Sequence, residues 1–197
     1  MVRDDFWAST SNKQLNFVQH VRNLLRVGGT AAVVVPDNVL FEGGPGETIR
    51  RRLLHKCDVD TLRQLPTGIF YAQGVKGNVL FFDRKPGSDT PWTKDLWTYD
   101  LRINQHFTLK TNTLARADLD DFVACYRPGQ RSTREESERF HRFTYDEFVA
   151  RDKASLDIFW LRDESLEDTD SLSPLGIMAA EIVEDLEAAL AEFSELA

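Results

Sequence analysis

The residues with the clearest chemical potential are two adjacent aromatics, Phe70 and Tyr71, in a segment rich in glycine and polar side chains. Enzymes that modify a nucleobase rotate it out of the duplex, and an aromatic ring can then stack on it. Gln73 and Lys76 follow closely and could contact DNA. The alternative interpretation is hydrophobic cover over the neighbouring strands, which is the commoner role of such a pair.

A second candidate is the pair Asp37-Asn38, which directly follows an apolar run from Thr30 to Val35. If that run is a strand of a parallel sheet, the pair lies at the carboxyl edge, where open α/β folds bind ligands. A turn stabilised by the Asp and Asn side chains is an equally good interpretation.

Three other patterns favour structural explanations. Gly43-Gly44-Pro45-Gly46 precedes a predicted helix, as a phosphate-binding loop does. It matches neither the dinucleotide fingerprint nor the Walker pattern, so we interpret it as a turn. Arg50-Arg51-Arg52 and the arginines between 127 and 142 could contact DNA phosphates, but a solvated face is the commoner reason for such charge. The four histidines lack metal-ligand spacing, and we expect no zinc site.

The elements that would position these residues alternate between helix and strand. Apolar spacing predicts helices over residues 12–26, from 45 or 47 to 56, and 115–126, with a last helix starting at Pro174. Strands are predicted at 30–35, 59–65, 78–82 and 96–101. The continuous apolar character of 30–35 favours a parallel strand buried on both faces. The short link between 59–65 and 78–82 favours an antiparallel hairpin at the sheet edge.

Size and charge limit the class of protein. A chain of 197 residues fits one domain with an appendage. We divide it into an α/β part (1–112) and a mainly helical part (113–197). No lysine or arginine follows Arg162, and eleven acids do, which leaves a net charge of +3 on residues 1–162. A nucleic-acid surface would therefore lie on those residues. With two cysteines and no signal segment, we expect a cytoplasmic protein.

Ten segments, in the same order along the chain, resemble the modification (M) subunits of type I restriction–modification systems, which are adenine-N6 DNA methyltransferases. The matching segments are DFW (5–7), SNKQLNF (11–17), VVVPDNVLFEGG (33–44), LPTGIFYAQGVK (65–76), NVLFF (78–82), WTYDLR (97–102), HFTLK (106–110), DLDDF (118–122), LDIFWL (156–161) and DESLED (163–168). They extend over nearly the whole chain.

The resemblance implies a Rossmann-type, S-adenosylmethionine-dependent methyltransferase sheet followed by a helical tail. It implies that Phe70, or else Tyr71, stacks on the flipped adenine, and that Phe17 lies near the cofactor adenine. Asp37 and Asn38 are assigned to the cofactor side of the site. The implied partners are DNA, a specificity subunit, a second M subunit and a restriction subunit. The acidic C-terminal helix resembles the segment used in assembly with the specificity subunit.

Two motifs of that family are missing from these 197 residues: the glycine-rich cofactor turn and the catalytic Asn-Pro-Pro-Phe. We therefore expect the C-terminal half of an M subunit, inactive by itself. The alternative is a non-catalytic assembly module or gene remnant that binds specificity or methyltransferase subunits. An NAD-dependent enzyme is a weaker third hypothesis, because no complete glycine fingerprint is present.

Overall fold

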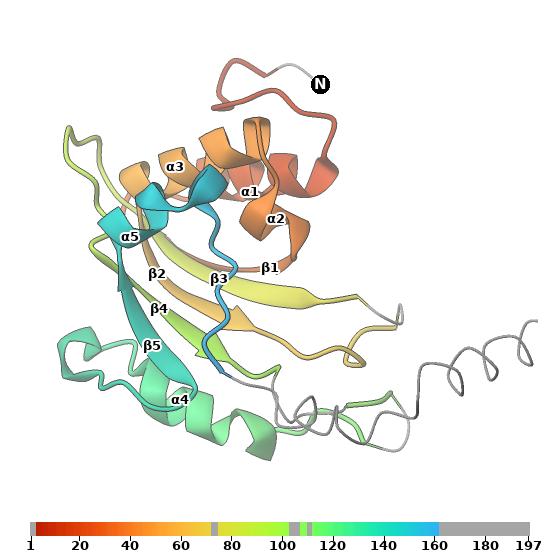
Figure 1. Ribbon diagram of the computed structural model, residues 1–197. Coiled ribbons are helices and arrows are strands. Elements are labelled where there is room, and N and C mark those ends of the chain that lie inside the picture. The colour runs from red at the N-terminus through yellow and green to blue at the C-terminus, as the bar shows by residue number, and fades with distance from the viewer. Residues whose placement is uncertain (1–2, 72–74, 103–106, 110–111, 162–197) are drawn as a thin grey trace, which may run out of the picture. The chain divides into compact units, whose positions relative to one another are not determined.

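The computed structural model describes residues 3–71, 75–102, 107–109 and 112–161, which build one five-stranded sheet with helices on both faces (Figure 1). The strands are β1 (Thr30–Pro36), β2 (Cys57–Gln64), β3 (Gly77–Arg84), β4 (Asp95–Asp100) and β5 (Phe140–Thr144). Their order across the sheet is β1-β3-β2-β4-β5. The predicted α/β class is confirmed.

Strand directions place one set of strand ends together. β3 lies antiparallel between β1 and β2, so β1 and β2 run parallel to each other. β2 also pairs in parallel with β4, which pairs antiparallel with β5. The antiparallel pairing of the second and third strands is confirmed. Their predicted place at the sheet edge is wrong, because β1 occupies the other side of β3.

The helices divide between the two faces of the sheet. α1 (Lys13–Leu24), α2 (Asn38–Phe41), α3 (Pro45–Lys56) and α5 (Tyr145–Ala150) lie on one side, and α4 (Asp120–Tyr126) lies on the other (Figure 1). Short 3₁₀ turns cover Ala117–Leu119, Arg131–Thr133 and Asp152–Ala154. The apolar spacing thus located α1, α3 and α4 correctly, with ends that differ by a few residues.

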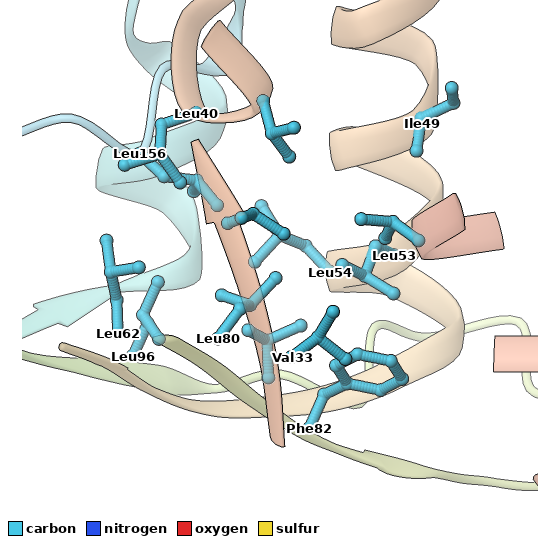
Figure 2. Packing of buried hydrophobic residues seen from close by; sticks show 14 of the residues in the cluster. Val33, Leu40, Ile49, Leu53, Leu54, Leu62, Leu80, Phe82, Leu96 and Leu156 are labelled. Carbon is cyan, nitrogen blue, oxygen red and sulfur yellow. The ribbon is translucent and has the colours of Figure 1, made fainter. Parts of the chain in front are cut away.

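An aliphatic core fills the space between the sheet and α1 and α3, as Figure 2 shows. Val33 from β1, Leu62 from β2 and Phe82 from β3 point into it toward Leu54 of α3. Burial in β1 alternates, with Ala31, Val33 and Val35 inside and Thr30, Ala32 and Val34 outside. The prediction of a parallel strand buried on both faces is therefore wrong. In the described residues, β1 pairs only with β3, which is antiparallel to it, and the helices cover only one side of β1.

The opposite face carries a second, aromatic core beneath α4. Phe122 of α4 meets Tyr99 of β4 edge-on at 5.2 Å and stacks on Tyr126 at 5.2 Å. The Tyr99 hydroxyl donates a 2.7 Å hydrogen bond to Asp121. Ring pairs of this kind add to the stability from apolar burial.

Two arginines of the predicted basic segment attach the connection after α4 to the sheet. Arg134 donates two hydrogen bonds to the carboxylate of Asp60, at 2.8 and 3.0 Å. Arg131 reaches Asp58, Asp60 and Asp83 within 3.2 Å. The Arg134 side chain is buried, so its interpretation as a phosphate ligand or as part of a solvated face is wrong. A third of the Arg131 side chain is exposed, and its contact with DNA stays a prediction.

The division of the chain at residue 112 stays a prediction. Residues beyond that point contribute β5 to the same sheet as β4. The predicted helix from Pro174 and the whole acidic segment after Arg162 lie outside the described residues.

Candidate functional site

The candidate site lies at the sheet edge where β1, β2 and β4 end and β3 begins. Pro36 of β1 is opposite Gly77 of β3, and Gln64 of β2 is opposite Asn78. Asp37 and Asn38 therefore emerge next to the start of β3. This is the edge at which open α/β sheets bind ligands.

Hydrogen bonds orient both members of the Asp37-Asn38 pair. Asn78 Nδ2 donates a 2.7 Å bond to Asp37 Oδ1. Asn38 Nδ2 donates to Glu42 at 3.3 Å, and Glu42 also accepts a 2.6 Å bond from Asn12, the residue that caps α1. The pair thus connects β3 with the starts of α2 and α1.

Arg102, just beyond β4, is the centre of a polar network at the same edge. Its guanidinium contacts Asp100 at 2.7 Å, Gln64 Oε1 at 3.0 Å and Asp157 at 3.2 Å. It also donates a 3.0 Å bond to the carbonyl oxygen of Ile158. Asp100 is fully buried, so this cation compensates a carboxylate that water does not reach.

The charges of predicted site residues change the pKa of Asp157. Burial raises the pKa of its carboxyl, the positive charge of Arg102 opposes that rise, and the negative charge of Asp37 adds to it. Lys76 lowers the pKa of Asp157 through its own charge. The structure therefore brings Asp37 and Lys76 into one electrostatic neighbourhood with a carboxylate that sequence reasoning did not single out.

A buried arginine of α3 positions two of these segments. Arg50 donates hydrogen bonds to the carbonyls of Val39 and Glu42, at 3.0 and 2.7 Å, and to those of Lys153 and Ala154, at 2.7 and 3.1 Å. Burial lowers the pKa of Arg50 to about 10. The interpretation of Arg50 as a phosphate contact or part of a solvated face is therefore wrong, because all of these donors serve carbonyls inside the fold.

The hydrogen bonds of Arg50 also hold a strained turn. Lys153 and Ala154 have φ angles of +54° and +47°, in the left-handed region that side chains with a Cβ rarely adopt. Their two carbonyls are the ones that Arg50 binds. The turn directs residues 155–161 from the helical layer past the sheet (Figure 1). In this segment, Asp157 contacts Gln64 and Arg102 of the site.

Two glycines shape the loop that carries Phe70 and Tyr71. Gly68 has φ +85°, and a Cβ there would lie 1.9 Å from the carbonyl oxygen of Phe107. A Cβ on Gly77 would lie 2.5 Å from the ring of Phe70. Phe70 is half-buried, packed against the aromatic core, whereas Tyr71 is 93% exposed. Gln73 lies outside the described residues, and Lys76 is exposed.

Phe17 projects from α1 with 54% of its surface exposed. It lines a cavity of about 490 Å³ together with Phe6, His20 and Arg3, which donates a 3.0 Å bond to His20 Nδ1. It also lines a second hollow of about 260 Å³ with Val34 and Pro36 at the end of β1. One face of this ring is thus available to a flat ligand beside the candidate site.

Gln64, Asn78, Arg102 and Asp157 are the site residues that sequence reasoning missed. Each is adjacent to or within a matching segment, but polar residues at strand ends carry no periodic signal.

In the described part of the chain, no three metal-binding side chains gather as a metal site. None of the described helices is long and apolar enough to cross a bilayer.

Comparisons with known proteins agree with the recognised segments. A family model described as N-6 DNA Methylase matches residues 2–158. The StySJI methylase subunit of Salmonella typhimurium is 42% identical over 219 aligned positions, which cover 95% of this chain and 41% of that protein. The crystal structure of the type I restriction enzyme EcoKI M protein has a TM-score of 0.74 at 38% identity, covering 95% of this chain and 44% of its own.

A further solved structure, of the type I R-M system and its complex assembly, has a TM-score of 0.66 at 25% identity. It covers 97% of this chain and 40% of its own. The chain therefore spans about two-fifths of the proteins that it matches.

Proposed function

Because this chain belongs to the N-6 DNA methylase family, we propose that it is part of a type I modification subunit that methylates adenine N6 in DNA. The observation that carries the proposal is the agreement between the matching relatives and the geometry of one sheet edge. That edge gathers Asp37, Asn38 and Lys76 beside the loop of Phe70.

The chain's own residues would bind and orient the base. Phe70, seated on Gly77, would stack on the extruded adenine, with Tyr71 as the second choice. Gln73 and Lys76 would contact the DNA around it. A ring with a fixed position serves this role well, because orientation of the amino group governs the rate of transfer.

The residues present fit one part of S-adenosylmethionine, its adenine ring. When bound, this cofactor supplies an electrophilic methyl group. Phe17 would cover the adenine from the 490 Å³ cavity, and Asp37 and Asn38 would face the rest of the molecule from the end of β1. The chain contains neither a glycine-rich cofactor turn nor Asn-Pro-Pro-Phe, so these groups must come from additional polypeptide.

We place the additional polypeptide alongside β1, on the side of this strand that faces away from β3. Among the described residues, β1 pairs only with β3 and leaves its other edge without a strand. Val34 faces outward beside it and is 56% exposed. An open edge next to apolar side chains favours pairing with a further strand. We place the specificity subunit, a second M subunit and a restriction subunit as partners of the completed assembly.

The first experiment supplies the missing groups. The chain is co-expressed with the segment of the StySJI methylase subunit that precedes its matching region, together with a specificity subunit. We expect adenine methylation of DNA by the complex and none by the chain alone. The chain alone should also show no micromolar S-adenosylmethionine binding in titration calorimetry. Complex formation without methylation would contradict the proposal.

A second experiment tests the stacking residue in that complex. Phe70→Ala should lower methyl transfer by about fivefold or more, because a base stack contributes about 1–3 kcal/mol. Tyr71→Ala is the matched control and should have the smaller effect. The reverse order would transfer the role to Tyr71, and no effect of either would remove both.

The alternative function is a non-catalytic assembly module. The exposed apolar groups around β1 favour it as well, because they would serve docking without catalysis. Co-purification with a specificity or M subunit, with no methylation in any combination, would support this function.

A further inference from the structure

The exposed ring of Phe159 lies on the guanidinium of Arg102. The Cζ atom of Arg102 is 4.0 Å from the centroid of the Phe159 ring, and 63% of Phe159 is exposed. A cation above an aromatic ring is attracted to the face of the ring by the ring's quadrupole. The ring therefore has one face on a cation, while most of its surface is open to solvent.

The support beneath this ring is fixed. Arg102 is held by Asp100, Gln64 and Asp157, at distances of 2.7 to 3.2 Å. Only 11% of its side chain is accessible. A planar cation held from several sides presents a fixed surface on which the ring packs.

The backbone on both sides of Phe159 is fixed as well. The carbonyl of Ile158 accepts a 3.0 Å bond from Arg102, and the carbonyl of Asp157 accepts a 2.8 Å bond from Arg151. Trp160 follows and donates a 2.9 Å bond to the carbonyl of Glu138. Phe159 is thus an exposed side chain on a segment whose neighbours are tied to the sheet and to the helical layer.

Both ends of the loop that carries Phe70 are next to this segment. Gln64, at the start of the loop, donates a 3.0 Å bond to Asp157. Lys76, at its end, is close enough to lower the pKa of Asp157 through its charge. Phe159 therefore shares the sheet edge with the proposed target-base loop.

We propose that Phe159, backed by Arg102, is a second stacking platform that binds an unpaired DNA base beside the loop of Phe70. The platform rests on the proposed function for the identity of its ligand. An oriented ring next to cations is the arrangement by which proteins hold single-stranded nucleic acid: bases stack on the ring and cations follow the backbone. Two further cations act on Asp157, two residues before the ring: Lys76 through its charge and Arg151 through a hydrogen bond to the Asp157 carbonyl.

The test uses the full chain and a fluorescent single-stranded oligonucleotide of about 12 nucleotides, with fluorescence anisotropy as the readout. Phe159→Ala should weaken binding by about fivefold or more. Phe159→Trp should restore it. Leu24→Ala is the control, because Leu24 is an exposed apolar residue (72%) at the C-terminal end of α1, next to the start of β1 rather than to the strand ends that carry the platform. It should bind as the unchanged chain does.

Two further readouts separate stacking from charge. An oligonucleotide of the same length with abasic positions should bind the unchanged chain and Phe159→Ala equally, because it offers no base to stack. The ratio between the two proteins should also stay constant with salt, since salt dependence reports phosphate contacts.

Equal affinities of the unchanged chain and Phe159→Ala for the intact oligonucleotide would overturn the platform, as would absence of binding by the unchanged chain. Either result would assign the exposed ring to a polypeptide surface. Neither result bears on methylation by the completed complex, which the co-expression experiment measures separately.

Discussion

The aliphatic core under α1 and α3 and the polar network around Arg102 border the same strands but are built in opposite ways. The core takes leucines, valines and Phe82 from every strand and helix that it touches. In the network, hydrogen bonds and ion pairs from Arg102 join it to three side chains: Gln64, Asp100 and Asp157. Removal of one core member leaves a cavity among the others, whereas removal of Arg102 leaves two carboxylates without their cation.

This difference shows which interactions fix the positions of individual side chains in the protein. Apolar burial is non-directional and roughly proportional to area, so the core fixes the layers but not the angle of any single side chain. Hydrogen bonds and ion pairs depend on direction, and a partly satisfied buried network is costly. The network can therefore fix the orientation of Phe159 and the position of residues 155–161, which the core alone cannot do.

The largest expected effect comes from the core. Phe82 is fully buried between the sheet and α3 (Figure 2). Phe82→Ala should lower the free energy of unfolding by about 3–5 kcal/mol, because it removes apolar contacts and leaves a cavity. Urea denaturation followed by circular dichroism would measure it. Phe41→Ala, at a half-exposed position, should show a clearly smaller loss, and equal losses would contradict the core assignment.

The next effect comes from the network. Arg102→Gln leaves Asp100 and Asp157 without a cation at a site where Asp100 is buried. We expect a loss of about 2–3 kcal/mol, below the range for fully buried pairs because part of Arg102 reaches water. Arg52→Gln on the exposed face of α3 is the matched control, with an expected change within about 0.5 kcal/mol. Equal urea midpoints for the two variants would show that the network contributes nothing to stability.

Sequence patterns predicted the part of the molecule that depends on local repetition. The helical spacing of Leu15 and Val18 and the apolar run before Pro36 were sufficient to locate α1 and β1. The strand order was not predictable, because nothing in the spacing of 59–65 and 78–82 indicates that β1 pairs with β3 from the other side. The two-sided burial of β1 failed for a related reason, since apolar character does not tell how many layers cover a strand.

The candidate site was predicted in part. Asp37 and Lys76 both act electrostatically on Asp157, because strand ends on one edge meet whatever the loop lengths are, whereas their binding roles stay predictions. Asp157 was not found, because it reaches that edge only through the strained turn at Lys153 and Ala154 that Arg50 holds. The interpretation of Arg50 as a phosphate contact or part of a solvated face failed for a similar reason. A run of arginines on a helix does not show which of them turns inward to bind carbonyls.

The smallest expected effect compares two carboxylates with opposite pKa shifts, Asp157 in the segment after the strained turn and Asp83 in β3. Burial raises the pKa of Asp157 above its ordinary 3.8, against the opposing charge of Arg102. At Asp83, burial also acts to raise the pKa, but the hydrogen bond from Thr30 and the charge of Arg131 outweigh it and lower the pKa below 3.8. In the folded protein, Asp157 therefore holds its proton more tightly than in the unfolded chain, and Asp83 holds its proton less tightly.

The two shifts predict opposite pH dependence for the two Asp→Asn variants. As pH rises from 3.8 through the raised pKa of Asp157, the unchanged protein should lose stability relative to Asp157→Asn, because the folded state resists the charge. As pH rises from the lowered pKa of Asp83 to 3.8, it should gain stability relative to Asp83→Asn. Thermal unfolding from about pH 3 to pH 7 would record both trends. Parallel trends for the two variants would mean that the network around Arg102 does not keep Asp157 away from water, and the contrast between the two sites would fail.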